Sequence, residues 1–171
     1  MTDLNAIHRA QVRAGENAVI ESLQRQGLSD PVEGNPFIID AGRTLQKAAY
    51  TASAEAGWWG SMNLAADLPI DVREARSGTK LGKLLISQKL CLIHSEVSEA
   101  MEGARKDLDD DKLPRRKMLE VELADAAIRI FDLAGALGFD LGCAIAEKMA
   151  YNAQREDHKL EVRAAAGGKA F

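Results

Sequence analysis

The sequence has little of what stabilises small disulfide-linked domains. It contains two cysteines, Cys91 and Cys143, in 171 residues. Both fall in apolar stretches with helical periodicity, where cysteine commonly packs as a small apolar side chain. A disulfide framework is therefore not expected, and a reducing compartment is favoured.

Long apolar runs and an excess of basic residues are also missing. No apolar run approaches the length of a membrane span, and the first residues, Met-Thr-Asp-Leu-Asn, lack the basic and apolar parts of a signal peptide. The formal net charge of -4 gives the chain no basic excess for binding a nucleic-acid polymer. We expect a cytoplasmic protein that binds neither membranes nor nucleic-acid polymers.

The spacing of apolar residues predicts an all-α fold, a helical bundle in one domain. The predicted helices cover residues 4–26, 40–56, 80–106, 115–137 and 140–159. Asp40 is the expected N-cap of the second helix, and Gly138 is the expected glycine at the end of the fourth. The third helix is expected to bury an apolar side with Glu96 at its edge. That side is formed by Leu90, Ile93, Val97, Ala100, Met101 and Ala104.

These helices divide the chain into three expected parts. Residues 1–79 form amino-terminal helices and an irregular segment, residues 80–159 form the functional core, and residues 160–171 form a flexible tail. The second helix is rich in alanine and the fourth is apolar nearly all round. Because they carry more apolar surface than a short bundle needs, we expect a homo-dimer or homo-tetramer.

Four carboxylates in the core occur in pairs spaced i,i+3, namely Glu96 with Glu99 and Glu122 with Asp125. Residues at this spacing share a helix face. The second pair begins a narrow polar stripe that continues with Arg129 and Asp132 in an otherwise apolar helix. Buried carboxylates are costly without partners, so the stripe implies a compensating cation. Ligands that are all oxygens favour Mg²⁺, with Mn²⁺ also possible.

Structural explanations compete with this reading. The first pair alone is typical of a solvated helix face. Arg129 is able to neutralise Asp125 or Asp132 as a structural ion pair. A ferritin-like di-iron centre requires Glu-x-x-His pairs, and neither pair has a histidine three residues on. Taken together, the two pairs favour a metal site.

A second acidic motif is weaker. Asp107, Asp109 and Asp111 have the spacing of the start of a calcium loop. However, Lys112 and Met118 stand where such a loop needs glycine and glutamate. We interpret this segment as a charged turn.

The order Glu96-x-x-Glu99 followed by Glu122-x-x-Asp125 resembles the E-x-x-E…E-x-x-D signature of the MazG-like, all-α nucleoside triphosphate pyrophosphohydrolases. Downstream, Lys148-x-x-Tyr151-Asn152-x-x-Arg155 is similar to the K-x-x-Y-N-x-x-R segment of many members. The resemblance covers about residues 80–159. It implies that the metal ligands, which act in catalysis through metal and water activation, are Glu96, Glu99, Glu122 and Asp125. It also implies that Lys148, Tyr151, Asn152 and Arg155 bind phosphate or sugar.

Three residues outside these motifs are further candidates for substrate binding. Trp58 and Trp59 are able to stack on a base, although aromatic residues after a helix more often anchor packing. Lys80 lies in a segment that lacks the glycine spacing and preceding strand of a phosphate loop, yet it can still contact phosphate.

These observations predict a Mg²⁺-dependent enzyme that hydrolyses a nucleoside or deoxynucleoside triphosphate to the monophosphate and pyrophosphate. The alternative is a non-catalytic protein of the same fold that binds a nucleotide or a protein partner. The four intact carboxylate positions favour the enzyme.

Overall fold

The computed structural model describes residues 35–60 and 69–164. The helix predicted over residues 4–26 lies outside the described residues, as do residues 165–171 of the predicted tail. The helices are α2 (Pro36–Glu55), α3 (Ile70–Arg76), α4 (Lys80–Lys106), α5 (Met118–Leu137), α6 (Leu141–Ala153), η1 (Glu156–His158) and α7 (Leu160–Ala164). The described ranges contain no strand, and their helices pack on one another, so the all-α helical bundle is confirmed. None of the helices in these ranges combines the length and apolar character needed to cross a membrane.

The chain divides into two compact units. One comprises residues 38–145, with most of α2, all of α3, α4 and α5, and the start of α6. The other contains the rest of α6, η1 and α7 within residues 146–171. The carboxylates and both tryptophans belong to the first unit.

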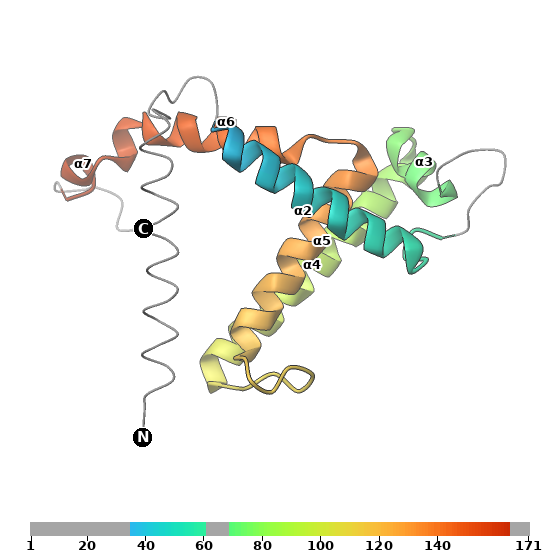
Figure 1. The fold of residues 1–171 in the computed structure, drawn as a ribbon, viewed down its shortest axis with the longest axis horizontal. Coiled ribbons are helices and arrows are strands. Elements are labelled where there is room, and N and C mark those ends of the chain that lie inside the picture. The colour runs from blue at the N-terminus through green and yellow to red at the C-terminus, as the bar shows by residue number, and fades with distance from the viewer. Residues whose placement is uncertain (1–34, 61–68, 165–171) are drawn as a thin grey trace. The chain divides into compact units, whose positions relative to one another are not determined.

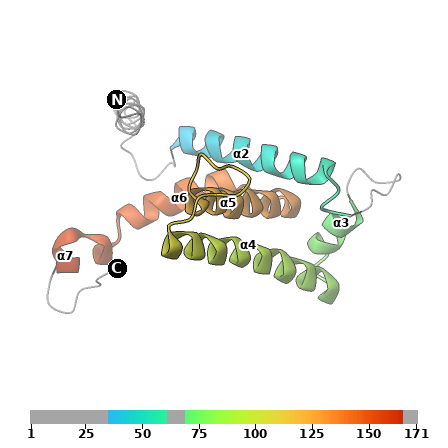
Figure 2. The ribbon, with the colours of Figure 1, turned by 90° about the horizontal axis from the view of Figure 1, so that it is seen from below.

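The antiparallel helices α4 and α5 form the centre of this first unit and lie side by side in Figures 1 and 2. Small residues lie on the buried sides of both helices, with Ala100 and Gly103 on α4 and Ala126 on α5. A Cβ atom on Gly103 would stand only 3.0 Å from the backbone nitrogen of Leu119. The two backbones therefore approach closely, and side chains on the facing sides are brought together.

The turn between α4 and α5, residues 107–117, is held by its own side chains. The buried Asp110 accepts hydrogen bonds from two backbone N–H groups of the turn, at 3.0 and 2.6 Å. The Nζ of Lys117 lies 2.8 Å from Asp109 and 3.2 Å from Asp107, and these carboxylates raise the pKa of the lysine. A lysine thus supplies the positive charge among the aspartates, which agrees with a charged turn.

α2 packs on α5 from the side away from α4, so α5 is the middle helix of the three (Figure 2). These contacts require glycine. A Cβ on Gly135 of α5 would lie 2.6 Å from the Cβ of Tyr50, and a Cβ on Gly42 of α2 would lie 2.6 Å from the Cα of Gly142 in α6. Any larger residue at these positions would force the helices apart.

The apolar core of this unit is centred on Trp59, which is 1% exposed. It packs in a cluster with Val72 of α3 and with Leu133 and Ala136 of α5. Its indole Nε1 donates a hydrogen bond of 2.7 Å to the buried Asp132. One tryptophan therefore ties the segment after α2 to both α3 and α5.

The starts of two helices differ from the predicted bounds. α2 begins at Pro36, before the predicted N-cap Asp40. The side-chain oxygen of Asn35 accepts a hydrogen bond of 3.0 Å from the backbone of Phe37, so Asn35 takes the capping role. Proline is favoured at the first helical position. α5 begins at Met118, after the turn has closed, and ends at Gly138 with φ of 74° as predicted.

Two short helices were not predicted. α3 lies in the segment interpreted as irregular, because its 7 residues are too few to display a period. Its Val72 and Ala75 are nevertheless buried. α7 (Leu160–Ala164) begins the segment expected to be a flexible tail.

The buried side of α4 also differs from the prediction. Ala100 is buried and Ile93 packs against the core, as predicted, but Leu90, Val97 and Met101 are 47%, 49% and 67% exposed. Glu96 and Gly103 are buried in their place. Apolar residues on two sides of α4 left its orientation ambiguous. The packing against α5 selects the side that carries small residues and a glutamate.

Replacing Trp59 with phenylalanine should destabilise the protein. The change keeps an aromatic ring in the core but leaves the buried Asp132 without its 2.7 Å donor, which should cost about 1 to 3 kcal/mol. Chemical denaturation would measure this loss. The matched change at the 71% exposed Trp58 should alter the free energy of unfolding by about 0.5 kcal/mol or less. Equal effects of the two changes would contradict the assigned role of Trp59.

Candidate metal centre

Three of the four predicted ligands converge where α4 faces α5. Each of these residues places one carboxylate oxygen within 4.8 Å of the others, and the three are Glu96, Glu122 and Asp125. The i,i+3 spacing places Glu122 and Asp125 on the same face of α5, and the close packing of the helices brings Glu96 opposite them. Glu96 and Glu122 are only 6% and 8% exposed.

The cluster is electrostatically strained. Burial raises the pKa of Glu122 to about 7, helped by its hydrogen bond with Glu96 and by the negative charges of Glu99, Glu96 and Asp125. A carboxyl group with this pKa is half protonated near neutral pH. A divalent cation would relieve the same repulsion while displacing that proton.

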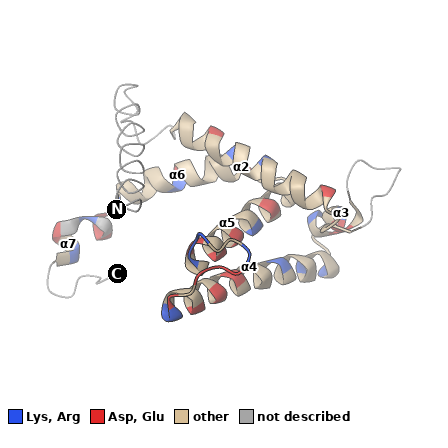
Figure 3. Cartoon of the chain, turned by 60° about the horizontal axis from the view of Figure 1, so that its bottom comes forward, with Lys and Arg blue, Asp and Glu red and all other residues tan. Residues whose placement is uncertain are grey.

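Glu99 occupies a different position from the other three. It is exposed and lies outside the group of converging oxygens. Its charge nevertheless contributes to the raised pKa of Glu122, so it lies close to the cluster. Figure 3 shows the wider pattern on α4, where acidic residues follow a stretch that carries lysines.

The cluster fits a hard divalent ion. All its donor atoms are oxygens, which suit Mg²⁺ and Mn²⁺. Metal–oxygen distances of about 2.1 Å place bound ligand oxygens about 3 to 4 Å apart. Oxygens that already lie within 4.8 Å need only small side-chain movements to reach that spacing.

Arg129 forms an ion pair that the sequence did not indicate. Its Nε lies 2.8 Å from Oε1 of Glu96. Sequence reasoning considered Asp125 and Asp132 as its partners, because they share its helix face. The partner instead comes from α4, so the ion pair links the two helices at the carboxylate cluster.

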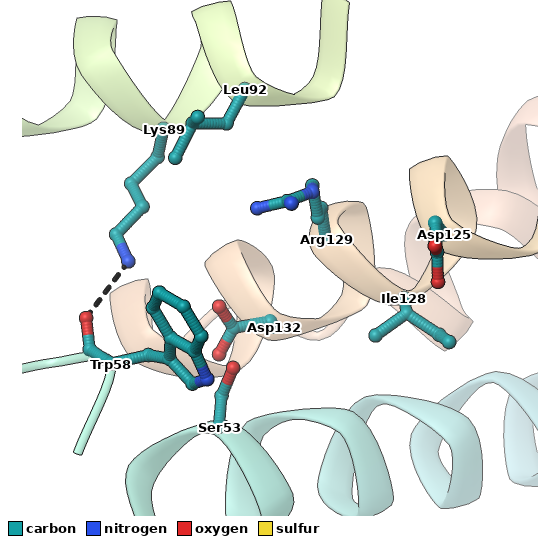
Figure 4. Close-up of a pocket in the computed structure, with 8 residues that line it drawn as sticks. All are labelled: Ser53, Trp58, Lys89, Leu92, Asp125, Ile128, Arg129 and Asp132. Carbon is teal, nitrogen blue, oxygen red and sulfur yellow. Dashed lines mark hydrogen bonds between the residues drawn. The ribbon is translucent and has the colours of Figure 1, made fainter. Parts of the chain in front are cut away.

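A pocket of about 220 Å³ opens beside the cluster. Its lining residues are Ser53, Trp58, Lys89, Leu92, Asp125, Ile128, Arg129 and Asp132 (Figure 4). Asp125 belongs both to the pocket and to the cluster, so the pocket adjoins the clustered carboxylates. The exposed ring of Trp58 offers an apolar face at the other end.

Lys89 and Asp132 organise the Trp58 end of the pocket. The Nζ of Lys89 donates a hydrogen bond of 3.1 Å to the backbone oxygen of Trp58 and lies 4.0 Å from the ring centroid of Trp59. Burial lowers the pKa of Lys89, and the charge of Asp132 opposes this effect. Burial also raises the pKa of Asp132, against the effect of the Trp59 hydrogen bond and the charge of Lys89.

The two tryptophans predicted to contact a base lie in different environments. Trp58 lines the pocket and stays a candidate for stacking on a base. Trp59 is buried in the core, so the prediction that it stacks on a base is wrong, and the packing role considered for it is correct. Lys80 is exposed at the start of α4 and is absent from the pocket lining, so its contact with phosphate stays a prediction.

The predicted substrate-binding residues of α6 and beyond belong to the second unit. Lys148 Nζ lies 4.6 Å from the ring centroid of Tyr151. Arg155 forms a 2.6 Å ion pair with Asp157. The side-chain oxygen of Asn152 is buried and has no hydrogen-bond partner among the described residues. Their binding of phosphate or sugar stays a prediction.

Sequence reasoning missed Lys89 as a site residue. A signal for it was present, because Lys89 precedes Glu96 by two helical turns and so shares its face of α4. The predicted apolar side of α4 placed Glu96 at its edge, so the face that Lys89 shares with Glu96 was not recognised as the side facing α5. Ser53 of α2 was also missed, since spacing within one helix does not reveal contacts with another.

The raised pKa of Glu122 predicts a pH dependence of stability in the metal-free protein. The folded state keeps a proton up to about pH 7, whereas the unfolded chain releases it near the ordinary value of 4.5. The free energy of unfolding should therefore fall as pH rises between these values. Glu122→Gln should remove about 1 to 3 kcal/mol of that fall.

Chemical denaturation in excess chelator at about pH 4.5 and pH 7 would measure this difference. Glu120→Gln is the matched control, because Glu120 is an exposed glutamate on the same helix. It should keep the pH dependence of the wild type. The same dependence in wild type and Glu122→Gln would contradict the raised pKa.

Comparison with known proteins adds no assignment. No family model, curated protein or solved structure matches this chain. The geometry of the carboxylate cluster and its pocket, with the sequence resemblance described above, is therefore the basis of the functional proposal.

Proposed function

We propose that this protein is a Mg²⁺-dependent hydrolase that converts a nucleoside or deoxynucleoside triphosphate to the monophosphate and pyrophosphate, with Mn²⁺ as a possible substitute. The observation that carries the proposal is the convergence of oxygens from Glu96, Glu122 and Asp125 within 4.8 Å at the edge of a pocket. The resemblance to MazG-like pyrophosphohydrolases supports the same reaction.

The residues of the pocket have separate tasks in this reaction. Trp58 offers its exposed ring to the base, while Lys89 and Arg129 provide positive charge for phosphate oxygens. The three clustered carboxylates hold the metal. Bound Mg²⁺ would neutralise the triphosphate and lower the pKa of a water that attacks the α-phosphorus.

Glu99 is the candidate for orienting that water. It is exposed and lies close enough to Glu122 to influence its pKa, yet it is outside the cluster of three oxygens. A carboxylate in this position is available to accept a proton from the attacking water. No covalent intermediate with the protein is needed, since water attacks directly.

The first test is the identity of the products. With Mg²⁺, a panel of canonical and modified nucleoside triphosphates should include one that yields the monophosphate and pyrophosphate, and excess chelator should stop the reaction. Glu122→Gln and Asp125→Asn should each lower kcat by about a hundredfold or more, because each removes a metal ligand. Product separation by ion-exchange chromatography would measure both effects.

Glu120→Gln, the exposed control on the same helix, should keep wild-type activity. Formation of the diphosphate and orthophosphate would contradict the proposed bond cleavage. Binding of nucleotide without turnover across the whole panel would instead favour the non-catalytic alternative.

We further propose that the protein forms a homo-dimer or homo-tetramer. Large apolar side chains remain exposed on both central helices, including Leu90, Val97 and Met101 on α4 and Leu123 and Ile130 on α5. Large apolar side chains exposed on neighbouring helices are often covered in a protein–protein interface.

Light scattering at micromolar concentration should therefore give at least twice the chain mass. Met101→Lys should lower that mass, because it places a charge on the exposed apolar side of α4. The control Gln88→Lys adds the same charge at an exposed position on the opposite side of the helix. A monomeric wild type, or equal effects of both changes, would contradict this interface.

A further inference from the structure

The ion pair between Arg129 and Glu96 stands in the way of metal binding. Glu96 is one of the three carboxylates whose oxygens converge, and its Oε1 lies 2.8 Å from Nε of Arg129. A guanidinium and a divalent ion at this position compete for the same buried negative charge.

The side chain of Arg129 also faces the pocket. Its side chain is 42% exposed, in contrast to 8% for Glu96, and it lines the pocket. Figure 4 shows its guanidinium between Lys89 and Asp125. Its contact with Glu96 is made through Nε, and the guanidinium carries further N–H donors on its terminal nitrogens that can serve a ligand in the pocket.

Lys89 lies near enough to Arg129 for each to feel the charge of the other. The positive charge of Arg129 disfavours the charged form of Lys89. Two like charges on the wall of one pocket are stabilised when an anion binds between them. A planar guanidinium is well suited to paired phosphate oxygens, and an ammonium can bind an adjacent oxygen.

We infer that Arg129 is an exchangeable counter-ion. In the metal-free protein it neutralises Glu96, and on metal binding it gives up Glu96 and turns to an anionic oxygen of the ligand beside Lys89. This inference rests on the proposed metal site. It adds a coupling between the carboxylate cluster and the pocket. Metal binding at the cluster would release Arg129, which would then bind the phosphate-bearing ligand in the pocket.

A fixed structural ion pair predicts different behaviour. If Arg129 held Glu96 in place for the metal, its loss would weaken metal binding. If Arg129 is exchanged for the metal, its loss removes a competitor and strengthens metal binding. In both cases the metal-free protein loses stability, because a buried carboxylate loses its partner.

Direct titration with Mn²⁺, followed by electron paramagnetic resonance, would separate the two models. Arg129→Gln should bind Mn²⁺ about tenfold more tightly than wild type, because it removes the positive charge that competes with the metal for Glu96. Its melting temperature without metal should fall, and the rise on adding Mg²⁺ should exceed that of wild type. Arg129→Lys should shift affinity in the same direction by less, because lysine keeps the charge but not the planar fork.

Lys89→Gln is the matched control, since it removes the same charge from the same pocket without touching a clustered carboxylate. It should change Mn²⁺ affinity by about twofold or less. This change measures the effect of losing one positive charge from the pocket without breaking the ion pair with Glu96. With saturating Mg²⁺, both Lys89→Gln and Arg129→Gln should weaken binding of inorganic pyrophosphate about tenfold, measured by calorimetry.

The outcomes separate this inference from the proposed function. If wild type binds Mn²⁺ and Glu122→Gln does not, the metal site stands. In that case, weaker or unchanged Mn²⁺ binding by Arg129→Gln overturns the exchange alone, as does unchanged pyrophosphate binding. Wild type that does not bind Mn²⁺ overturns both.

Discussion

The close approach of α4 and α5 is the contact on which the rest of the site depends. Ala100, Gly103 and Ala126 leave little side-chain volume between the two backbones. Glutamates on the facing sides are therefore pressed together and cut off from water. The apolar packing of the bundle supplies the free energy that holds Glu96 and Glu122 in this unfavourable arrangement, which Arg129 offsets only in part.

The sequence was most informative where one helix determines the answer. The i,i+3 spacing placed Glu122 and Asp125 together, the polar stripe identified a pocket wall, and Gly138 marked the end of α5. Each conclusion depends on the period of a helix or on the chemistry of its end, and both are local properties of the chain. The all-α fold was predictable for the same reason.

Contacts between helices were harder to predict. Spacing reveals which residues share a helix face but not what lies opposite that face. It therefore did not indicate that Arg129 pairs with a residue of α4. The pair Trp58 and Trp59 shows the same limit, since adjacent residues in a turn point into core and pocket respectively. The buried side of α4 was misplaced because apolar residues occur on both its sides, and only the packing surface of α5 decides between them.

The crossing of Gly42 and Gly142 has a consequence for how the pocket tolerates variation. A side chain at either position would meet backbone atoms, which cannot rotate away as a flexible side chain can. Accommodating one would therefore tilt α2 as a rigid rod. Because α2 carries Ser53 near its far end and leads into Trp58, the tilt would widen or narrow the pocket at a distance. Gly42 and Gly142 line no part of the pocket, yet their close contact fixes the position of the helix that carries one wall of it.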